Sequence, residues 1–569
     1  GLPWAELAAL LPPAPPPGGR GSNAWVVAGG RTGSGAPLLA NDPHLGLQAP
    51  GVWYLAHLRA PGLNAIGATL PGVPGVVLGR NDRIAWGFTN GEADTQDLFV
   101  ERLDPADPDR YLTPDGPVPF GRREEVIRIK GAEEPVRLTV RTTRHGPVLS
   151  DLLPPPATGS FGGDRVLALA WPALAEDDRT FQAGLGLAAA RDWEGFVLAL
   201  RDFGAPPQNV VYADVDGRIG FYTAGRVPVR AAGDGTMPVP GWSGAYDWEG
   251  VIPFDDLPHA VDPADGAFVN ANNRPVGPDY PYLLSADWPP AYRARRIEEL
   301  LAARGDHGLA DFRRMQGDLL SMLARDLLPL MLAAEPEGDD ARAAMARLAA
   351  WDGMMAADRP EPLLFAAWYR ALAPALYADE LGPLFDAYRG LRAQFLRRVL
   401  TERAVWCDDV TTPARESCPE VMGLALERAL AELRERHGTD ADGWRWGEPH
   451  AARMVHPLFG DRPPLDRLFN IERPVGGDST TVNVGHYVAA DPVRPFAVVF
   501  APSYRGLYDL ADPDRSRFVP ATGQSGNPLS PHYADLTALW TAGGDVPMTT
   551  DRAEFADRAI GVLRLEPVP

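Results

Sequence analysis

Apolar and polar positions alternate in short runs over residues 22–268, and glycine, proline and asparagine separate these runs. Period-two alternation between turn residues is typical of β-strands. Residues 210–214 and 219–222 flank Asp216-Gly217, a dipeptide that strongly favours a hairpin turn. Further strands are predicted at 53–58, 76–78, 84–86, 126–129 and 138–140. The first half of the chain is therefore predicted to be mainly β-structure.

Apolar residues at helical spacing interrupt this strand pattern once, and they dominate a long stretch further along the chain. Residues 192–201 predict one helix, with Asp192 well placed as its N-cap. From about 290 to 436 apolar residues recur three and four positions apart, which predicts helices. The strand pattern returns at 480–484 and 496–500.

Strands, then helices, then strands again predict a layered α+β fold. We expect a first part of the β-rich core at 22–290, a mainly helical segment at 291–445, and a return to the core at 446–569. Residues 1–21 precede this core and contain the proline-rich stretch 11–19, which indicates the end of a spacer peptide or a plain stiff linker.

Composition narrows the class of protein. The 569 residues are 45% hydrophobic and 23% charged, which is ordinary for a globular protein with a large core. The formal net charge of −21 argues against nucleic acid or an anionic membrane as a partner. No apolar run is long enough to span a bilayer. The chain begins without Met or a signal peptide, so we expect an N-terminal part to be missing.

The two cysteines, Cys407 and Cys418, lie close together, and the residues between them predict a loop. In an oxidising compartment they could form a disulfide, which would stabilise the fold by roughly 3 kcal/mol on the chain-entropy model. The alternative is two free thiols. No cysteine or histidine spacing suggests zinc.

The most informative stretch is Gly21-Ser22-Asn23-Ala24-Trp25, followed by Asn41-Asp42-Pro43-His44-Leu45. A serine hydroxyl is a weak nucleophile and needs a nearby base. If Ser22 were the first residue of its chain, its own α-amine, with a pKa near ~8, could accept the hydroxyl proton. Gly21 allows unusual backbone angles at such a cleavage point. Alone, however, the Gly21-Ser22 pair would read as an ordinary strand entry.

Seven separated segments, in this order and spacing, resemble the penicillin acylase family of the N-terminal nucleophile hydrolases over most of the chain. They are Ser22-Asn23-Ala24-Trp25, Asn41-Asp42-Pro43-His44-Leu45, Pro71-Gly72-Val73-Pro74, Trp86-Gly87-Phe88-Thr89-Asn90, Asn270-Ala271-Asn272-Asn273, Tyr292-Arg293-Ala294-Arg295-Arg296-Ile297 and 523–533. The resemblance implies a four-layer αββα sandwich with a helical insertion. It also implies self-cleavage between Gly21 and Ser22, and a heterodimer with the α segment of the same precursor.

The resemblance assigns roles to four further residues. The backbone N–H of Asn90 and the side chain of Asn272 match the oxyanion donors that amide hydrolysis needs. Arg293 matches an arginine that orients the active-site asparagine and the substrate. His44 stands where cephalosporin and acyl-homoserine lactone acylases carry histidine and classical penicillin G acylases carry glutamine. The sequence indicates no carboxylate partner for His44, and each residue also has a purely structural reading.

The acyl pocket follows from register with the family. Leu45 and Leu78 fall where phenylacetyl-preferring members place aromatic rings, and Gln208 and Val210 lie near another pocket position. Aliphatic walls in place of rings favour a flexible alkyl acyl chain. The alternative is that these residues are plain core.

Asp94, Gln96 and Asp97 match a calcium-binding stretch of the family, with Gly235 as a possible carbonyl donor. Such a calcium ion would be structural, and catalysis needs no cofactor. The family site also uses a glutamate of the α segment and a later aspartate, for which this chain has no match. The alternative is a solvated acidic loop.

These features together predict an acylase that cleaves an acyl chain from an amine-bearing group, in a β-lactam, an acyl-homoserine lactone, or an acyl-amino acid or peptide. Its substrate would be a small molecule, and its location periplasmic or secreted. The alternative is an unprocessed or inactive homologue that binds acyl ligands. The chain has no GxSxG elbow, and its glycine-rich stretch at 29–35 lacks the helix that a dinucleotide site requires.

Overall fold

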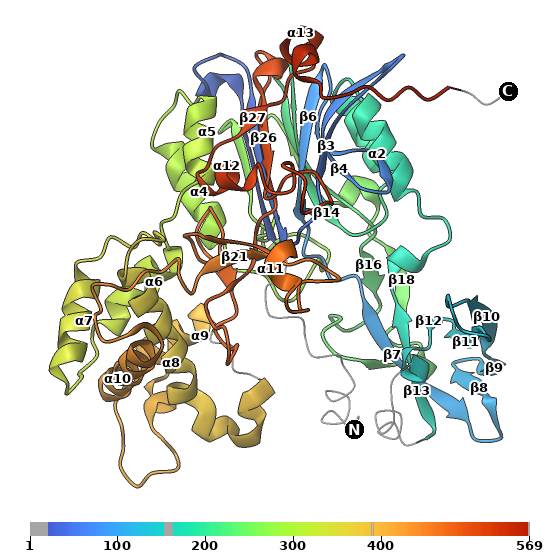
Figure 1. The fold of residues 1–569 in the computed structure, drawn as a ribbon. Coiled ribbons are helices and arrows are strands. Elements are labelled where there is room, and N and C mark those ends of the chain that lie inside the picture. The colour runs from blue at the N-terminus through green and yellow to red at the C-terminus, as the bar shows by residue number, and fades with distance from the viewer. Residues whose placement is uncertain (1–20, 153–162, 388–389, 391, 567–569) are drawn as a thin grey trace.

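Two large sheets stacked face to face form the centre of the computed structural model, which describes residues 21–152, 163–387, 390 and 392–566 (Figure 1). The spacer predicted at 1–21 lies outside the described residues except for Gly21. The ten-stranded sheet contains β20 (Ala267–Asn270), β1 (Gly21–Val27), β2 (Leu38–Gly46), β25 (Tyr504–Asp509), β26 (Arg517–Pro520), β27 (Val546–Pro547), β24 (Val498–Pro502), β23 (His486–Tyr487), β21 (Ala451–Met454) and β22 (Ile471–Pro474). The seven-stranded sheet runs in the order β19 (His259–Val261), β15 (Ile219–Ala224), β14 (Gln208–Asp214), β6 (Ile84–Asn90), β5 (Val73–Arg80), β4 (Leu63–Leu70) and β3 (Tyr54–Ala60).

Strand β1 is buried on both faces, and its side chains alternate between two apolar cores. Ala24 and Val26 face the space between the two sheets, whereas Trp25 and Val27 lie in a core on the outer face of the ten-stranded sheet. Successive side chains of a strand point to opposite faces. The seven residues of β1 are therefore held from both sides.

Helices cover the outer face of each sheet. Helices α4 (Tyr292–Ala302) and α5 (Leu309–Gln316) pack on the ten-stranded sheet, and α2 (Thr180–Ala189) and α3 (Trp193–Leu200) pack on the seven-stranded sheet. Figure 1 shows α4 and α5 on one side of the two sheets and α2 on the other. The order helix, sheet, sheet, helix confirms the four-layer αββα architecture.

The long helical stretch divides between two places. Its first two helices, α4 and α5, belong to the sandwich. The remaining helices form a lobe with its own core, to which Leu327, Phe365, Trp368 and Leu426 contribute fully buried side chains. This lobe contains α6 (Met322–Met331), α7 (Asp339–Ala349), α8 (Glu361–Leu381), α9 (Ala393–Thr401) and α10 (Cys418–His437).

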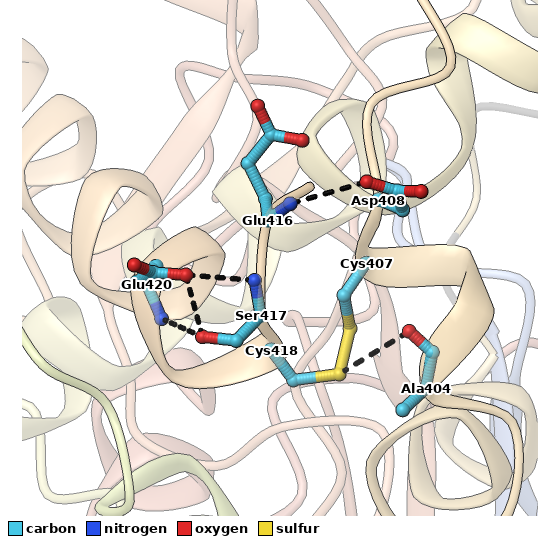
Figure 2. The surroundings of a disulfide bond; sticks show 7 residues. All are labelled: Ala404, Cys407, Asp408, Glu416, Ser417, Cys418 and Glu420. Carbon is cyan, nitrogen blue, oxygen red and sulfur yellow. Dashed lines mark hydrogen bonds between the residues drawn. A yellow bond between two sulfur atoms is a disulfide. The ribbon is translucent and has the colours of Figure 1, made fainter. Parts of the chain in front are cut away.

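A disulfide joins Cys407 to Cys418 inside the helical lobe, with an S–S distance of 2.00 Å (Figure 2). Cys418 is the first residue of α10, and Ser417 before it caps the helix. The carboxylate of Glu420 accepts the backbone N–H of Ser417 at 2.8 Å, which completes a capping box. The disulfide and the cap together hold the start of α10 against the preceding loop.

Smaller elements surround the sandwich. They include β7 (Asp97–Asp104), β8 (Asp107–Thr113), β9 (Gly116–Pro119), β13 (Arg165–Ala170) and β17 (Val239–Pro240) in one sheet, β10 (Gly121–Ile127), β11 (Val136–Thr143) and β12 (Gly146–Pro147) in another, the pair β16 (Pro228–Arg230) and β18 (Trp248–Val251), and short helices α11 (Asp466–Phe469), α12 (Thr537–Thr541) and α13 (Arg552–Phe555). Among the described residues, no helix combines the length and apolar character that crossing a membrane requires.

Local patterns predicted the hairpins well and missed elements that packing decides. The hairpin across Asp216-Gly217 and the N-cap Asp192 are both present. Helix α2 was not predicted, because Gly184 and Gly186 are weak helix formers. A Cβ on Gly186 would lie 2.8 Å from the Cβ of Ala199, so glycine there lets α2 pack closely on α3.

The strand predicted at 480–484 is wrong. The buried carboxylate of Asp478 accepts the backbone N–H groups of Thr480 and Thr481, at 2.6 and 3.0 Å. These hydrogen bonds fold the segment into turns, an alternative that a side-chain acceptor offers to the backbone.

Candidate active site

Ser22 lies at the start of β1, where the register with β2 fixes its surroundings. Gly21 pairs with His44, Ser22 with Pro43, and Asn23 with Asp42. Paired residues of an antiparallel ladder share a face. The side chain of Ser22 therefore points with Ala24 into the space between the sheets. His44 and Asp42 lie on the opposite, helix-covered face.

Three polar contacts hold Ser22, which is only 6% exposed. Its N–H donates to Oδ1 of Asn272 at 2.7 Å, and its carbonyl accepts Nη1 of Arg293 at 2.7 Å. Its Oγ donates to the carbonyl oxygen of Gly21 at 2.6 Å. The hydroxyl thus lies directly against the peptide bond between Gly21 and Ser22.

Asn272 is held in the left-handed region, at φ +68°, which asparagine tolerates better than most residues. Its backbone N–H donates to Oδ1 of Asn270 at 3.0 Å. Its side-chain Oδ1 accepts both Ser22 N–H and Nη2 of Arg293, and its Nδ2 donates to the carbonyl of Asn90 at 3.0 Å. An amide NH₂ carries two hydrogens, so Nδ2 has capacity for a second acceptor.

Asn270 joins the two sheets at this point. Its Oδ1 accepts the hydroxyl of Thr89 at 2.6 Å and Nδ2 of Asn209 at 3.2 Å. Asn209 in turn accepts the hydroxyl of Thr223 at 2.7 Å. Sequence reasoning missed this network, because these residues meet only when the inner faces of two sheets are stacked.

Asn41 forms a second link between the sheets. Its Nδ2 donates to the carbonyls of Asn23 and Phe88, both at 2.8 Å, and its Oδ1 accepts the N–H of Phe88 at 3.1 Å. A Cβ on Gly87 would lie 2.6 Å from the Cβ of Asn41, so only glycine leaves room for this approach. Strand β6, which ends at Asn90, is thereby tied to β1 and β2.

Asp42 is the carboxylate partner of His44. Its Oδ2 lies 2.7 Å from Nε2 of His44 and accepts Nδ2 of Asn23 at 2.9 Å, and both Asp42 and His44 are fully buried. Burial lowers the pKa of His44, against the raising effect of the Asp42 hydrogen bond and charge. A neutral imidazole whose Nε2–H donates a hydrogen bond to Asp42 has a free lone pair on Nδ1.

That Nδ1 atom has no hydrogen-bond partner among the described residues. It lies 3.5 Å from the position that a Cβ on Gly21 would take. The free acceptor of His44 is therefore turned towards the Gly21–Ser22 junction. The sequence did contain a signal for the partner, because residues two apart on a strand share a face.

Arg293 comes from the first turn of α4 and contacts three groups of the site. Besides Ser22 and Asn272, it donates to Oδ1 of Asn23 at 2.7 Å. Burial lowers the pKa of Arg293 to about 10, while Asp42 and Glu92 act in the opposite direction. The guanidinium is therefore charged at neutral pH, and it fixes both the backbone of Ser22 and the amide of Asn272.

Glu92 is a site residue that sequence reasoning did not single out. It has a left-handed φ of +50°, unusual for glutamate, and its Oε1 accepts Nδ2 of Asn90 at 2.8 Å. Burial raises the pKa of Glu92, and the hydrogen bond from Asn90 and the charge of Arg293 lower it. A carboxylate therefore lies beside the strand end that carries the predicted oxyanion donor.

The predicted pocket residues divide between two faces of the seven-stranded sheet. Leu78 belongs to the core between the sheets, which also contains Ala24, and Leu45 packs against this core. Val210 lies instead in the core under α2 and α3. Gln208 shares that face and donates to Oδ1 of Asn90 at 3.4 Å. The structure thus places Leu45 and Leu78 at the same core, on the Ser22 side, and Val210 in a different one.

A cavity of about 450 Å³ opens at the edge of the two sheets. Phe221 and Phe268 line it from the inner faces, and Asn270 and Asn273 line it from the segment that carries Asn272. None of the four predicted pocket residues lines this cavity. Its volume is within the range of small-molecule sites.

Three of the predicted calcium residues, Asp94, Asp97 and Gly235, do meet, but around an arginine, whereas Gln96 is exposed. Asp97 accepts Nε and Nη2 of Arg230 at 2.8 and 3.0 Å, and Gly235 packs against Asp94. Calcium prefers six to eight oxygen ligands, whereas here both oxygens of Asp97 face a guanidinium. Over the described ranges, no three His, Cys, Asp or Glu side chains gather to hold a metal. The residues present therefore do not fit a calcium ion.

Comparison with solved structures identifies the class of fold. Over 96% of this chain and 100% of the other, the structure matches that of a thermostable penicillin G acylase from Alcaligenes faecalis, with a TM-score of 0.73 and 23% sequence identity. The four-layer sandwich is accordingly that of the N-terminal nucleophile hydrolases.

The sequence profile described as penicillin amidase matches residues 2–557, and the chain belongs to that family. It is 33% identical to the acyl-homoserine lactone acylase QuiP of Pseudomonas aeruginosa, and 34% identical to the penicillin acylase 2 proenzyme of Pseudomonas sp. strain SE83. Each alignment covers 96% of this chain and 69% of the relative. The family supports acylase activity, the hydrolysis of an amide bond.

Proposed function

We propose that this chain is an acylase in which Ser22, freed by cleavage of the Gly21–Ser22 bond, attacks the carbonyl of an acyl amide. The observation that carries the proposal is the set of contacts around Ser22. Its N–H and carbonyl are held by Asn272 and Arg293, and its hydroxyl lies 2.6 Å from the oxygen of the preceding carbonyl. A structural serine needs no such arrangement.

In the proposed reaction, the α-amine of Ser22 accepts the hydroxyl proton as Oγ attacks. Oδ1 of Asn272 holds that amine, and the charge of nearby Arg293 disfavours a second positive charge on it. The second N–H of Asn272 and the backbone N–H of Asn90 stabilise the tetrahedral oxyanion. The Ser22 α-ammonium then gives its proton to the leaving nitrogen, the C–N bond breaks and the amine departs, leaving an acyl-enzyme on Oγ. Water attacks the ester, the acid is released, and Oγ recovers its proton.

His44 and Asp42 supply a second acceptor in this proposal. The neutral imidazole turns Nδ1 towards the bond that is cleaved, because Asp42 holds its Nε2 proton. It can therefore take part in proton transfer during self-cleavage, before the Ser22 amine exists. This role parallels that of a carboxylate that fixes the tautomer of a catalytic histidine.

Replacing Asp42 tests this role. In Asp42→Asn the amide would favour the other tautomer of His44, with the proton on Nδ1. We expect the rate of self-cleavage to fall by about 10²- to 10⁴-fold, as for loss of a general base. Burial already keeps His44 neutral, because it lowers the pKa of the imidazole. The loss of self-cleavage rate should therefore be the same at all pH values above 6.5, without a shift in the pH profile of the rate.

The measurement is the rate of precursor cleavage as a function of pH, with folding checked by circular dichroism. Asp82→Asn, at an exposed turn, is the matched control and should behave as wild type. A folded Asp42→Asn protein with normal rates would contradict the assignment.

Leu45 and Leu78 support an aliphatic acyl group, because they put aliphatic side chains at the two positions where phenylacetyl-preferring members of the family place aromatic rings. We expect kcat/KM for straight-chain N-alkanoyl amides to exceed that for the phenylacetyl amide of the same amine by about 10-fold or more. The panel should pair each acyl group with homoserine lactone and a β-lactam nucleus. Equal or better turnover of the phenylacetyl amide would contradict the pocket assignment.

Two further proposals concern the protein around this site. The penicillin acylase 2 relative is a proenzyme, which supports processing of a precursor and a heterodimer with its α segment. The disulfide supports a periplasmic or secreted location, because disulfides persist in oxidising compartments. If Gly21–Ser22 stays uncut, the alternative is a homologue that binds acyl ligands without turning them over.

A further inference from the structure

Arg230, the last residue of β16, lies between the two carboxylates that begin the segment after Asn90. Its Nε and Nη2 donate to the two oxygens of Asp97, at 2.8 and 3.0 Å, in the paired geometry of an arginine and a carboxylate. Nη2 also donates to the backbone carbonyl of Asp94 at 3.1 Å and lies 3.6 Å from its Oδ1. One guanidinium thus contacts both acidic residues.

This contact is buried and closely packed. The side chains of Arg230 and Asp97 are 4% and 6% exposed. Trp248 donates its Nε1 proton to Asp97 at 2.5 Å. Gly235, with φ +80°, closes the site, since a Cβ there would lie 2.2 Å from Oδ2 of Asp94 and 2.7 Å from Nη2 of Arg230. The backbone of the 231–238 loop therefore approaches as closely as glycine allows.

We propose that the Arg230 guanidinium is the resident cation of this site and holds the Asn90–Asp97 segment in place of a divalent metal. A guanidinium carries its positive charge and its fixed fork of N–H donors on the side chain itself. A calcium ion would have to bind beside this fixed charge and displace hydrogen bonds from both oxygens of Asp97. The positive charge at this site is instead supplied by the side chain of Arg230, so the two carboxylates need no metal ion to balance them.

The position of the segment gives this cation a role in the active site. Asp94 is four residues after Asn90, whose backbone N–H is the predicted oxyanion donor. Gly91 N–H donates to the carbonyl of Pro207 at 3.0 Å, and Asp94 N–H to that of Leu284 at 2.7 Å. Arg230 adds the tie to β16. It is a positioning residue, and this part of the inference rests on the proposed function, whereas the metal replacement does not.

The first test is made on the wild-type protein. We expect purified protein to contain less than one calcium ion per chain, and its Tm to be unchanged by millimolar EDTA or calcium chloride. Stoichiometric calcium that survives dialysis, or a Tm that falls in EDTA, would overturn the proposal. These measurements do not use activity, so they stand whether or not the protein proves to be an acylase.

The second test removes the guanidinium. We expect Arg230→Gln to lower Tm by about 5 °C or more, because a buried carboxylate loses its partner. Millimolar calcium should restore much of this Tm in the variant and leave wild type unchanged. Magnesium should restore less, since it demands a stricter geometry. A variant with normal Tm, or one whose lowered Tm ignores calcium, would contradict the replacement.

Two variants complete the design. Arg230→Lys keeps the charge without the paired geometry, and it should show an intermediate Tm and no calcium response. Arg226→Gln breaks a pair with the exposed Asp177 and should change neither Tm nor calcium response. With an acyl amide substrate, Arg230→Gln should lower kcat with little change in KM, and calcium should restore kcat. A lowered Tm with an unchanged kcat would reject the positioning role and leave the metal replacement standing.

Discussion

Ser22→Ala is expected to leave the Gly21–Ser22 bond intact and to abolish acylase activity. The hydroxyl that lies 2.6 Å from the Gly21 carbonyl oxygen would be gone, and nothing else described at this junction offers a nucleophile. Loss of a catalytic serine in a comparable covalent mechanism costs on the order of 10⁶-fold in kcat. Intact mass of protein expressed from the full-length gene should show a chain beginning at Ser22 in wild type only.

Two variants serve as controls for this result. Ser22→Cys keeps a nucleophile at the same position and should still cleave, whereas Ser34→Ala removes an exposed hydroxyl in the turn after β1 and should behave as wild type. Cleavage after Gly21 in Ser22→Ala would contradict self-cleavage by the Ser22 hydroxyl. An uncut chain in wild type as well would favour the acyl-binding alternative.

Asn272→Ala is expected to lower kcat by about 10²- to 10³-fold, equivalent to ~2.7–4 kcal/mol of lost transition-state stabilisation. The variant loses the proposed oxyanion donor, and it also leaves Arg293 and the Asn90 carbonyl without their shared partner. Alanine at φ +68° adds strain of about 1 kcal/mol. Steady-state kinetics beside a thermal melt separates lost catalysis from lost stability.

Asn272→Gly isolates the donor, because glycine adopts this backbone conformation without strain. It should lose as much kcat as Asn272→Ala while it keeps more of the Tm. Asn527→Ala, in an exposed turn, is the matched control. A kcat for Asn272→Gly within a few-fold of wild type would reject the oxyanion role.

Much of the architecture could be read from local pattern. The Asp216-Gly217 hairpin and the short apolar run at 84–86 are short-range signals, and the strands they predict are present. The site residues Ser22, His44, Asn272 and Arg293 were predicted through their resemblance to a family, and the structure brings them together. Asp42 could have been added from sequence alone, because its spacing of two from His44 puts both side chains on one face.

Long-range pairing decided the rest. No local rule indicates that Asn209 and Thr89 meet Asn270, because this outcome depends on how the two sheets stack. Nor does one indicate that Val210 and Leu78 lie on opposite faces of their sheet, because this depends on the register of strands distant in sequence. Helix α2 exists because it packs on α3, against the preference of its glycines. The carboxylates of Asp94 and Asp97 read as metal ligands until Arg230, more than 130 positions along the chain, is placed between them.

The sequence by itself therefore predicted which residues carry the proposed chemistry and on which face of a strand each one lies, since backbone periodicity is a local property. Only the tertiary structure decided their partners. Asp42 and His44 share strand β2, whereas the two donors to Oδ1 of Asn272 come from β1 and α4, and the cation beside Asp97 comes from β16. Such contacts form only when burial brings distant segments together, and burial is a property of the whole chain.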